Sequence, residues 1–333
     1  MTLTDRFQNT GAPASATAPH PTGETRSCCE CGSLDVADCG ACRPYGDAVS
    51  LKQDAEPSAP LDPGRLYFCR SCGLGFRYPA SDAEQLNRLY SQLDSTRWKY
   101  DPNQMCSWLG AAAFLKKHLA PSARVLDIGC YDGAFLQTLP TTWKKSAIEP
   151  AVSAHGVLRE LGVRVVGRLL EAPVAEDREQ FDAVTLFDVL EHLEHPAQAL
   201  TNAYDYVAPG GYLLVFTGNC EHWTWSVLQG NHWYLDSVQH LRFASRRYFR
   251  KSAIRLGAQV REMHNLSHQK ADRRQKLQDV LEVISHGMFS RGHLGRITSN
   301  WLRRLTHMPP RRETAPYTTS LADHVLVVLQ RPH

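Results

Sequence analysis

Apolar and polar positions follow two different rhythms beyond about residue 120. Short apolar runs of strand length are separated by stretches in which apolar residues recur every three or four positions. The first rhythm is typical of buried strands, and the second is typical of helices that pack against a sheet. We therefore predict an α/β fold with strands near residues 124–128, 145–149, 163–166, 182–187, 211–216, 258–264 and 323–330. The predicted helices lie near residues 106–119, 132–139, 151–161, 196–207 and 245–256. Because strands and helices alternate, the sheet should be largely parallel.

A basic and amphipathic segment, residues 271–314, interrupts this alternation before the last predicted strand. Its apolar residues recur at helical spacing at Leu277, Val280, Leu281, Ile284, Met288, Ile297, Trp301, Leu302 and Leu305. Helices of this kind commonly pack on the body of a protein. The interleaved Arg296, Arg303 and Arg304 favour a second interpretation, in which the segment is a lid, a homodimer contact or a peripheral membrane contact. In that role its charge would attract a phosphate-bearing sugar or a glycolipid.

The size and composition of the chain favour one large domain and one small one. The chain has 333 residues, of which 43% are apolar, and this is ordinary for a soluble protein. No uninterrupted apolar stretch approaches the roughly 20 residues needed to cross a bilayer. Residues 1–27 are rich in Ala, Pro, Thr and Gly and lack the apolar core of a signal peptide. We therefore expect a disordered tail and a cytoplasmic protein.

The net charge of +3 is unevenly distributed. Between His268 and Arg312 there are ten Lys or Arg residues against three Asp or Glu residues, which leaves the rest of the chain mildly acidic. One basic segment on an acidic body favours a local anionic partner. We do not expect a specific nucleic-acid partner, because no RNA-binding motif accompanies the charge.

Seven of the ten cysteines lie between Cys28 and Cys72, mostly in Cys-x-x-Cys pairs. Two of these pairs are followed by glycine, which permits the tight turn that directs two thiolates at one ion. Two such pairs supply the closed tetrahedral set of a structural zinc site, here Cys28, Cys31, Cys69 and Cys72. A reduced, metal-free cluster or a redox pair is the alternative. The third pair, Cys39 and Cys42, could replace one of the two or remain free.

The second cysteine pair carries a family resemblance. The segment from Tyr67 to Pro79 (YFCRSCGLGFRYP), followed by LNRLY at residues 86–90, resembles the zinc-ribbon front end of bacterial methyltransferases that act on sugars and other small metabolites. We therefore expect a zinc-ribbon-like module over residues 28–80 and a helical connector over residues 81–120. The main domain should then occupy residues 121–333, with the helical insertion inside it.

Four motifs within the predicted sheet carry a second resemblance. The turn VLDIGCYDG at residues 125–133 joins the first strand to a helix, and Glu149-Pro150 ends the second strand. Asp188 follows the fourth strand, and Pro-Gly-Gly at residues 209–211 precedes the fifth. Glycines at such a turn let the backbone approach a ligand, and an acid at the next strand end can accept both ribose hydroxyls. In this order the motifs resemble class I S-adenosylmethionine (SAM)-dependent methyltransferases.

The second resemblance implies a Rossmann-like sheet of seven strands with an antiparallel last strand. The residues it places around SAM are Asp127, Gly129, Cys130 and Gly133 at the methionine part, Glu149 and Pro150 at the ribose and adenine, and Asp188 beside the sulfonium. The sequence departs from the family pattern twice. Tyr131 stands where a middle glycine is usual, and no acid follows the third strand to bind the adenine amino group. Backbone groups of Leu169 or Leu170, or the side chain of Glu171, could replace that acid.

The segment after the fifth strand is the predicted acceptor side, because it is rich in His and Trp. Residues 239–245 (QHLRFAS) resemble the Glu-His-Leu-x-Tyr-(Phe)-Ser segment of zinc-containing deoxysugar C-methyltransferases, whose His belongs to the base machinery. The resemblance makes His240 the first candidate for a general base, although Gln239 replaces the neighbouring acid. His192 is the second candidate and a pocket residue.

The sequence thus predicts a SAM-dependent methyltransferase with a structural zinc ion and a small-molecule acceptor. The expected reaction is O-methylation of a sugar, glycan or secondary metabolite, assisted by a histidine that removes a proton. Three alternatives stay open at this point. They are C-methylation of a deoxysugar nucleotide, RNA methylation, and a catalytically silent SAM-fold subunit.

Overall fold

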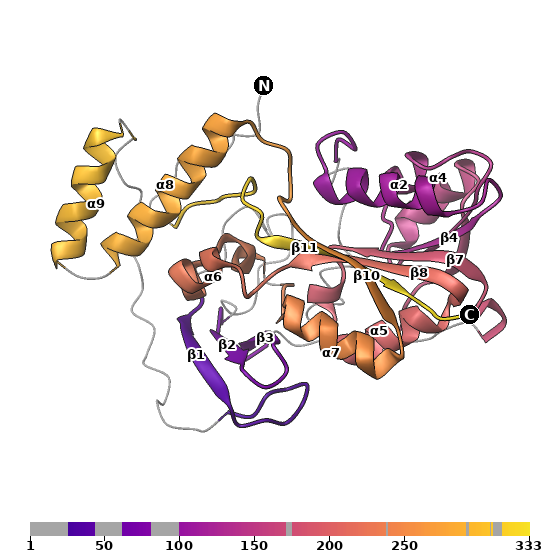
Figure 1. Cartoon of the computed structure of the whole chain (residues 1–333), viewed down its shortest axis with the longest axis horizontal. Coiled ribbons are helices and arrows are strands. Elements are labelled where there is room, and N and C mark those ends of the chain that lie inside the picture. The colour runs from indigo at the N-terminus through magenta and orange to yellow at the C-terminus, as the bar shows by residue number, and fades with distance from the viewer. Residues whose placement is uncertain are drawn as a thin grey trace.

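The computed structural model describes residues 26–43, 62–80, 100–170, 175–237, 239–290, 293–306, 308 and 315–333. The predicted tail up to residue 25, most of the gap between the two cysteine pairs, and residues 81–99 of the predicted connector lie outside these ranges. Within them, Figure 1 shows a large α/β body, a smaller group of strands from the start of the chain, and a pair of helices that projects at one end.

The body is built on a sheet of seven strands in the order β10-β11-β8-β7-β4-β5-β6. Its strands are β4 (Arg124–Ile128), β5 (Lys144–Ile148), β6 (Arg164–Gly167), β7 (Phe181–Phe187), β8 (Val207–Gly218), β10 (Gln259–Leu266) and β11 (His324–Gln330). The five strands from β4 to β8 are mutually parallel, and β11 runs antiparallel to both of its neighbours. This topology confirms the Rossmann-like sheet with an antiparallel last strand.

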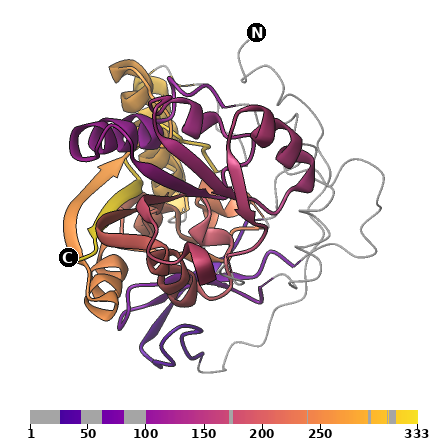
Figure 2. The same ribbon diagram turned by 90° about the vertical axis from the view of Figure 1, so that its right-hand side faces the viewer.

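Helices cover both faces of this sheet (Figures 1 and 2). Alternate residues of a strand point to opposite faces, so Val125 joins one apolar cluster and Leu126 joins the other. The first cluster is completed by α2 (Cys106–His118), α3 (Ala134–Gln137) and α4 (His155–Glu160). The second is completed by α5 (Pro196–Asp205) and α7 (Arg246–Leu256). Because both faces are buried, the central strands are apolar along most of their length.

Most predicted elements are present, and the differences concern their ends. The helix predicted over residues 132–139 is only the four-residue α3, which begins after Gly133 and ends before Pro140. The helix predicted over 151–161 starts as a 3-10 turn, η3 (Val152–Ala154), before α4. The strand predicted at 211–216 is longer, because Pro-Gly-Gly lies inside β8 at an irregular pairing with β7.

The N-terminal strands form a second sheet in the order β1-β2-β3-β9. Three strands come from the first 80 residues, namely β1 (Val36–Ala41), β2 (Arg65–Cys69) and β3 (Gly75–Tyr78). The fourth strand, β9 (Arg242–Phe243), belongs to the segment after β8 and pairs with β3. The segment that contains His240 is therefore attached to the N-terminal sheet.

Arg77 on β3 strengthens this attachment from a buried position with no exposed surface. Its guanidinium donates hydrogen bonds to the carbonyl oxygens of Leu235 at 2.7 Å, Ser237 at 3.2 Å and His240 at 3.2 Å. A fourth bond, at 2.9 Å, reaches the carbonyl of Pro63. One buried cation thus fixes the backbone at Leu235, Ser237 and His240 against the N-terminal sheet, because charged donors form strong hydrogen bonds in such surroundings.

The helical insertion forms a hairpin of α8 (Arg273–Phe289) and α9 (His293–Leu305) that projects from the body (Figure 1). Val283 of α8 packs on Leu228 of α6 (Trp223–Leu228). Arg303 does not belong to a surface patch, because it is 7% exposed and forms two hydrogen bonds with Glu282. Among the described residues, no helix is both long and apolar enough to span a membrane.

Candidate active site

The turn after β4 is held in an unusual backbone conformation. Gly129, Tyr131 and Gly133 have φ angles of 73°, 53° and 76°, in the left-handed region that favours glycine. A Cβ atom on Gly129 would lie 2.5 Å from Val189 Cγ2, so the turn also needs glycine for space. Tyr131 adopts the conformation that the missing middle glycine would have taken. The turn therefore keeps the shape expected of a cofactor loop despite the substitution.

Glu149 ties this turn to the end of β5. Its side chain is buried, one carboxylate oxygen accepts from the Tyr131 amide at 2.7 Å, and the other accepts from the Ala151 amide at 2.8 Å. Burial raises the pKa of Glu149 against the opposing effect of these two amides. Each oxygen keeps a second lone pair, so the carboxylate can still accept hydrogen bonds from a ribose.

Asp127 precedes the turn, near the carboxyl end of β4. It is 3% exposed, and its Oδ1 accepts from the Thr185 hydroxyl at 2.6 Å. Burial raises its pKa to about 7. The remaining residues predicted around SAM lie at the ends of neighbouring strands: Cys130 is buried in the turn, Pro150 follows Glu149, and Leu170 is buried after β6. Leu170 accepts a hydrogen bond through its carbonyl from Asn202. Glu171 lies outside the described residues.

Asp188, at the exit of β7, has a positive φ angle of 54°. Its Oδ2 lies 3.5 Å from Nε2 of His268, a residue of the loop after β10. Burial alone would raise the pKa of Asp188, but the neighbouring His268 lowers it overall. Burial likewise lowers the pKa of His268, and Asp188 raises it overall. Asp188 and His268 therefore each favour the charged form of the other at the exit of β7.

The two predicted histidines meet beside Glu191. His192 ends the turn η5 (Leu190–His192), and its ring centroid lies 4.8 Å from that of His240. Glu191 is fully buried and accepts hydrogen bonds from the hydroxyls of Tyr234 and Thr217. Burial, followed by the charge of Asp188, raises the pKa of Glu191 to about 8.

His240 is oriented by a backbone oxygen. Its Nδ1–H donates to the carbonyl of Tyr234 at 2.7 Å, which leaves the lone pair on Nε2. Burial lowers the pKa of His240 well below its ordinary value and that of His192 to about 4. Both rings are therefore neutral near pH 7, as a proton acceptor must be.

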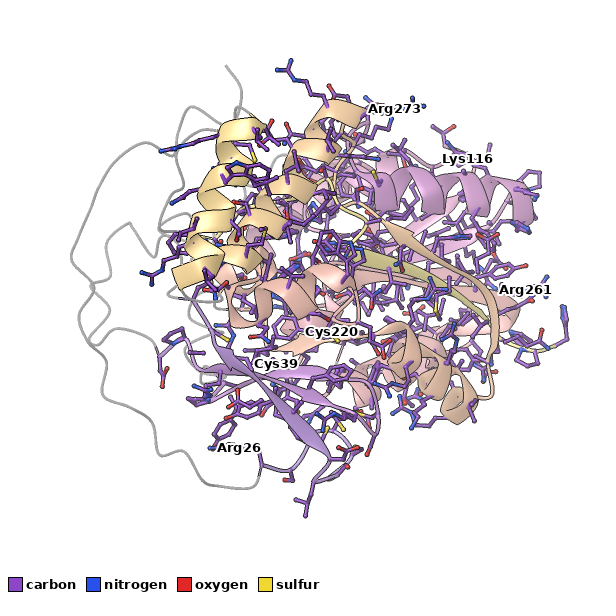
Figure 3. The ribbon with its side chains drawn as sticks, turned by 60° about the vertical axis from the view of Figure 1, so that its left-hand side comes forward. Arg26, Cys39, Lys116, Cys220, Arg261 and Arg273 are labelled. Atoms are coloured by element: carbon purple, nitrogen blue, oxygen red, sulfur yellow. The ribbon has the colours of Figure 1, made fainter. Side chains whose placement is uncertain are left out.

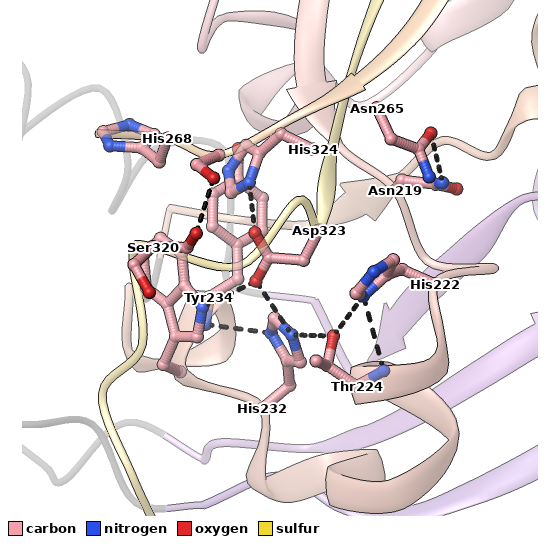
Figure 4. A network of polar contacts seen from close by, with 12 residues as sticks. Asn219, His222, Thr224, His232, Tyr234, Asn265, His268, Ser320, Asp323 and His324 are labelled. Carbon is pink, nitrogen blue, oxygen red and sulfur yellow. Dashed lines mark hydrogen bonds and ion pairs between the residues drawn. The ribbon is translucent and has the colours of Figure 1, made fainter. Parts of the chain in front are cut away.

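Figure 4 shows a polar network around Asp323 that the sequence patterns did not reveal. The ring of Tyr234 lies between it and His240, with its centroid 4.9 Å from that of His324 and 4.2 Å from that of His240. Asp323 accepts from Nδ1–H of His324 at 2.8 Å and from the indole of Trp233 at 2.9 Å. His232 lies 3.5 Å from the same carboxylate. The only sequence signal was a pair of polar residues at the start of an otherwise apolar strand. Trp225 and Trp233 are buried, so they are core residues of the segment after β8 and not an open stacking surface.

The four predicted zinc ligands come together. Sγ of Cys28 lies 3.7 Å from that of Cys72, Sγ of Cys31 lies 3.6 Å from that of Cys69, and all four sulfurs are within 4.8 Å of one another. A tetrahedral ion with Zn–S bonds of about 2.3 Å needs sulfur separations of about 3.8 Å, so the set fits zinc. Cys42 packs instead beside Trp225, and Cys39 lies on β1 (Figure 3). These two cysteines do not join the set.

Comparison with known proteins gives a consistent result. Residues 97–263 match the model of a family described as a methyltransferase domain. A ubiquinone biosynthesis O-methyltransferase from Shewanella pealeana is 32% identical over 103 residues, which are 29% of this chain and 44% of that protein. One of the same name from Burkholderia pseudomallei is 32% identical over 120 residues, 34% of this chain and 50% of that protein. The chain thus spans about half the length of these curated relatives.

Among solved structures, a similar one is the Burkholderia thailandensis 1,6-didemethyltoxoflavin-N1-methyltransferase with bound 1,6-didemethyltoxoflavin and S-adenosylhomocysteine. It is 13% identical, with a TM-score of 0.40 over 69% of this chain and 80% of that chain.

Proposed function

Because this chain belongs to the methyltransferase domain family, we propose that it transfers the methyl group of SAM to a small-molecule acceptor. The observation that carries the proposal is the turn from Gly129 to Gly133, whose Tyr131 amide is held by Glu149. This turn opens at the carboxyl ends of parallel strands, where α/β sheets bind cofactors. Glu149 would accept the ribose hydroxyls, and Asp188 would lie beside the sulfonium.

The chemistry needs alignment and a proton acceptor. SAM supplies a methyl group that its positive sulfur already activates. With SAM bound, His240 Nε2 would be the atom that takes up the proton released by an acceptor hydroxyl, because its Nδ1–H is already held by the Tyr234 carbonyl. Tyr234 holds His240 through its carbonyl and Glu191 through its hydroxyl, so one residue positions both groups.

We propose an oxygen acceptor on a sugar, glycan or secondary metabolite. Two observations support it. The curated relatives are named as O-methyltransferases, and a neutral histidine is the kind of base that a hydroxyl group requires. The zinc-ribbon-like segment at residues 67–79 also resembles the front end of methyltransferases that act on sugars and small metabolites, which favours the same class of acceptor.

We also infer that the α8–α9 hairpin contacts an anionic membrane surface. Leu294, Ile297, Trp301 and Leu305 share one face of α9 and are between 53% and 77% exposed. The exposed Arg304 flanks this face, and Arg273 lies at the surface at the start of α8 (Figure 3). An exposed apolar face with cations beside it is the pattern of helices that lie in a membrane interface.

Calorimetry with SAM tests the cofactor site directly. Gly129→Ala places a methyl group against Val189 and Glu149→Ala releases the turn, so each should weaken SAM binding at least about tenfold. Gly156→Ala is the matched control, because a Cβ there meets no atom within 4 Å. Unchanged SAM affinity in both variants, or no SAM binding by the native chain, would refute the proposal.

Incubation with SAM and metabolite extracts, followed by mass spectrometry, identifies the acceptor. The expected product is heavier than its precursor by one CH₂ group and carries a methyl ether. A product methylated on carbon or nitrogen would contradict the proposed oxygen acceptor and leave the SAM site intact.

A further inference from the structure

We propose that Asp188, His268 and His324 form a second metal site, which binds a divalent transition-metal ion. One ligand-type atom from each residue lies within 4.8 Å of the others. The three residues meet because of the sheet order. Asp188 follows β7 and His268 follows β10, whereas His324 begins the antiparallel β11, so all three lie at the same edge of the sheet.

Unsatisfied polar atoms mark the same three residues. Asp188 Oδ1, His268 Nδ1 and His324 Nε2 are buried and have no hydrogen-bond partner in the described part of the chain. The side chain of His324 is 1% exposed. Leaving a buried polar atom without a partner is destabilising, so three such atoms on neighbouring residues need an explanation. A metal ion bound here would take one ligand atom from each of the three residues.

Asp323 prepares His324 for this role. It accepts the Nδ1–H of His324 at 2.8 Å, and this leaves the lone pair on Nε2, the unpartnered atom. A carboxylate behind a histidine is the usual support of a metal ligand, because it fixes the tautomer and increases the basicity of the ring. Trp233 holds Asp323 in turn through its indole N–H at 2.9 Å.

The neighbouring cluster of Glu191, His192 and His240 also contains one carboxylate and two imidazoles, but most of its polar atoms have hydrogen-bond partners. Its ligand-type atoms also lie within 4.8 Å of one another. Both oxygens of Glu191, however, accept hydrogen bonds from hydroxyl groups, and Nδ1 of His240 donates to a carbonyl. None of its polar atoms is among the buried unpartnered ones. We therefore assign the proposed base, His240, to the cluster with Glu191 and His192. The proposed metal site is the cluster of Asp188, His268 and His324.

Two imidazoles and one carboxylate suit Zn²⁺, Fe²⁺ or a similar ion of the first transition series. Three protein ligands leave coordination positions open, unlike the closed set of four cysteines. An acceptor oxygen bound there would lose its proton more readily and would lie beside Asp188, where the methyl group arrives. This role for the metal rests on the proposed function, whereas the binding of the metal does not.

Metal counting on the full chain tests the site. The protein is stripped with a chelator and dialysed against Co²⁺ or Zn²⁺, and the bound metal is measured by mass spectrometry. His268→Ala and His324→Ala should each bind one equivalent less than the native chain. His264→Ala is the control and should lose none, because His264 lies on β10 with a 58% exposed side chain.

The Co²⁺ absorption spectrum separates the two sites. Thiolate ligands give sulfur-to-cobalt charge transfer, and this band should persist in His268→Ala while the remaining visible bands weaken. If His324→Ala does not fold, as circular dichroism would show, His268→Ala decides, since His268 lies on a loop. An unchanged metal count in His268→Ala overturns the proposal. A metal equivalent lost in that variant, together with no SAM binding by the native chain, would leave the metal site standing and refute the proposed function.

Discussion

The candidate base is held by a contact that most residues could supply, because it is a backbone carbonyl. The Tyr234 carbonyl fixes Nδ1–H of His240, so the ring orientation depends on the path of the chain and not on a second charged side chain. Burial then keeps the ring neutral. A neutral ring next to a positively charged methyl donor is a consistent pair, since the sulfonium would further disfavour protonation of the ring.

The acidic limb of the pH profile should therefore lie at unusually low pH. A histidine whose pKa is lowered acts as a base only above that pKa, so the fall in kcat caused by protonation of His240 should lie well below pH 6.5, apart from changes nearer pH 7 to 8 from Asp127 and Glu191. His240→Ala should lower kcat by about 10²–10⁴-fold and leave the Kd for SAM unchanged. The exposed His195→Ala is the control. A midpoint between pH 6 and 7 that is absent from the residual activity of His240→Ala would show that burial does not set the pKa of the base.

Arg77 also positions the segment that contains His240, although the two are far apart in the sequence. Arg77→Met removes the donor of three carbonyls in residues 235–240, so we expect a loss of unfolding free energy of about 3 kcal/mol and a lower kcat. The Kd for SAM should change little, because the carbonyls that Arg77 binds lie in the segment after β8, whereas the cofactor turn is held by Glu149. Arg65→Met, which breaks a surface pair with Asp38, should cost less than about 1 kcal/mol. Denaturant unfolding and SAM calorimetry measure both effects, and equal losses in the two variants would contradict this role.

At the scale of the elements, the sequence predicts the strands of the main sheet, but it does not predict the pairing of β3 with β9. The strands from β4 to β7 begin or end within about one residue of their predicted limits, because buried parallel strands are continuous apolar runs. The helix at 132–139 was predicted too long, because Pro140 and the turn at Gly133 leave room for one turn only. The two-residue β9 has no pattern of its own and exists because β3 offers it an edge.

The proposed membrane contact of the α8–α9 hairpin can be tested by substitution on α9. Trp301→Ser should weaken binding to phosphatidylglycerol vesicles at least about tenfold in sedimentation, since burying such a side chain contributes about 1.5–3 kcal/mol. Native binding should fall as salt is raised. Ile254→Ser is the control, because Ile254 is 82% exposed on α7, on another part of the molecule. Equal vesicle binding by Trp301→Ser and the native chain would exclude α9 as the contact.

At the scale of the whole molecule, the candidate site combines segments that the sequence keeps far apart. Motifs at 127–133, 149 and 188 could be predicted because each directly follows its strand. Asp323 and His324 could not, because their place beside Asp188 follows from the position of β11 within the sheet. The role of Arg77 was hidden for the same reason, since the carbonyls it binds come 158–163 residues later.

The four cysteines provide the prediction for the whole molecule. Cys69→Ser should remove one metal equivalent and lower the melting temperature, by roughly 2–4 °C for each kcal/mol lost, and leave the Kd for SAM within about twofold. Cys106→Ser, outside the set, should change neither the metal content nor the melting temperature appreciably. Full retention of bound metal in Cys69→Ser would show that this cysteine is not a ligand.

The pairing of β3 with β9 links two binding events that share no atom. Zinc bound at the cysteines would favour an ordered N-terminal sheet, and an acceptor bound beside His240 would favour an ordered β9, so both ligands would stabilise the arrangement in which β3 and β9 pair. Thermodynamic reciprocity then requires that each raise the affinity of the other by the same factor. Oxidation of the four cysteine thiols, which would prevent zinc binding, would accordingly weaken acceptor binding. If both ligands bind as proposed, removal of zinc would therefore weaken acceptor binding at the other end of the β3–β9 pairing.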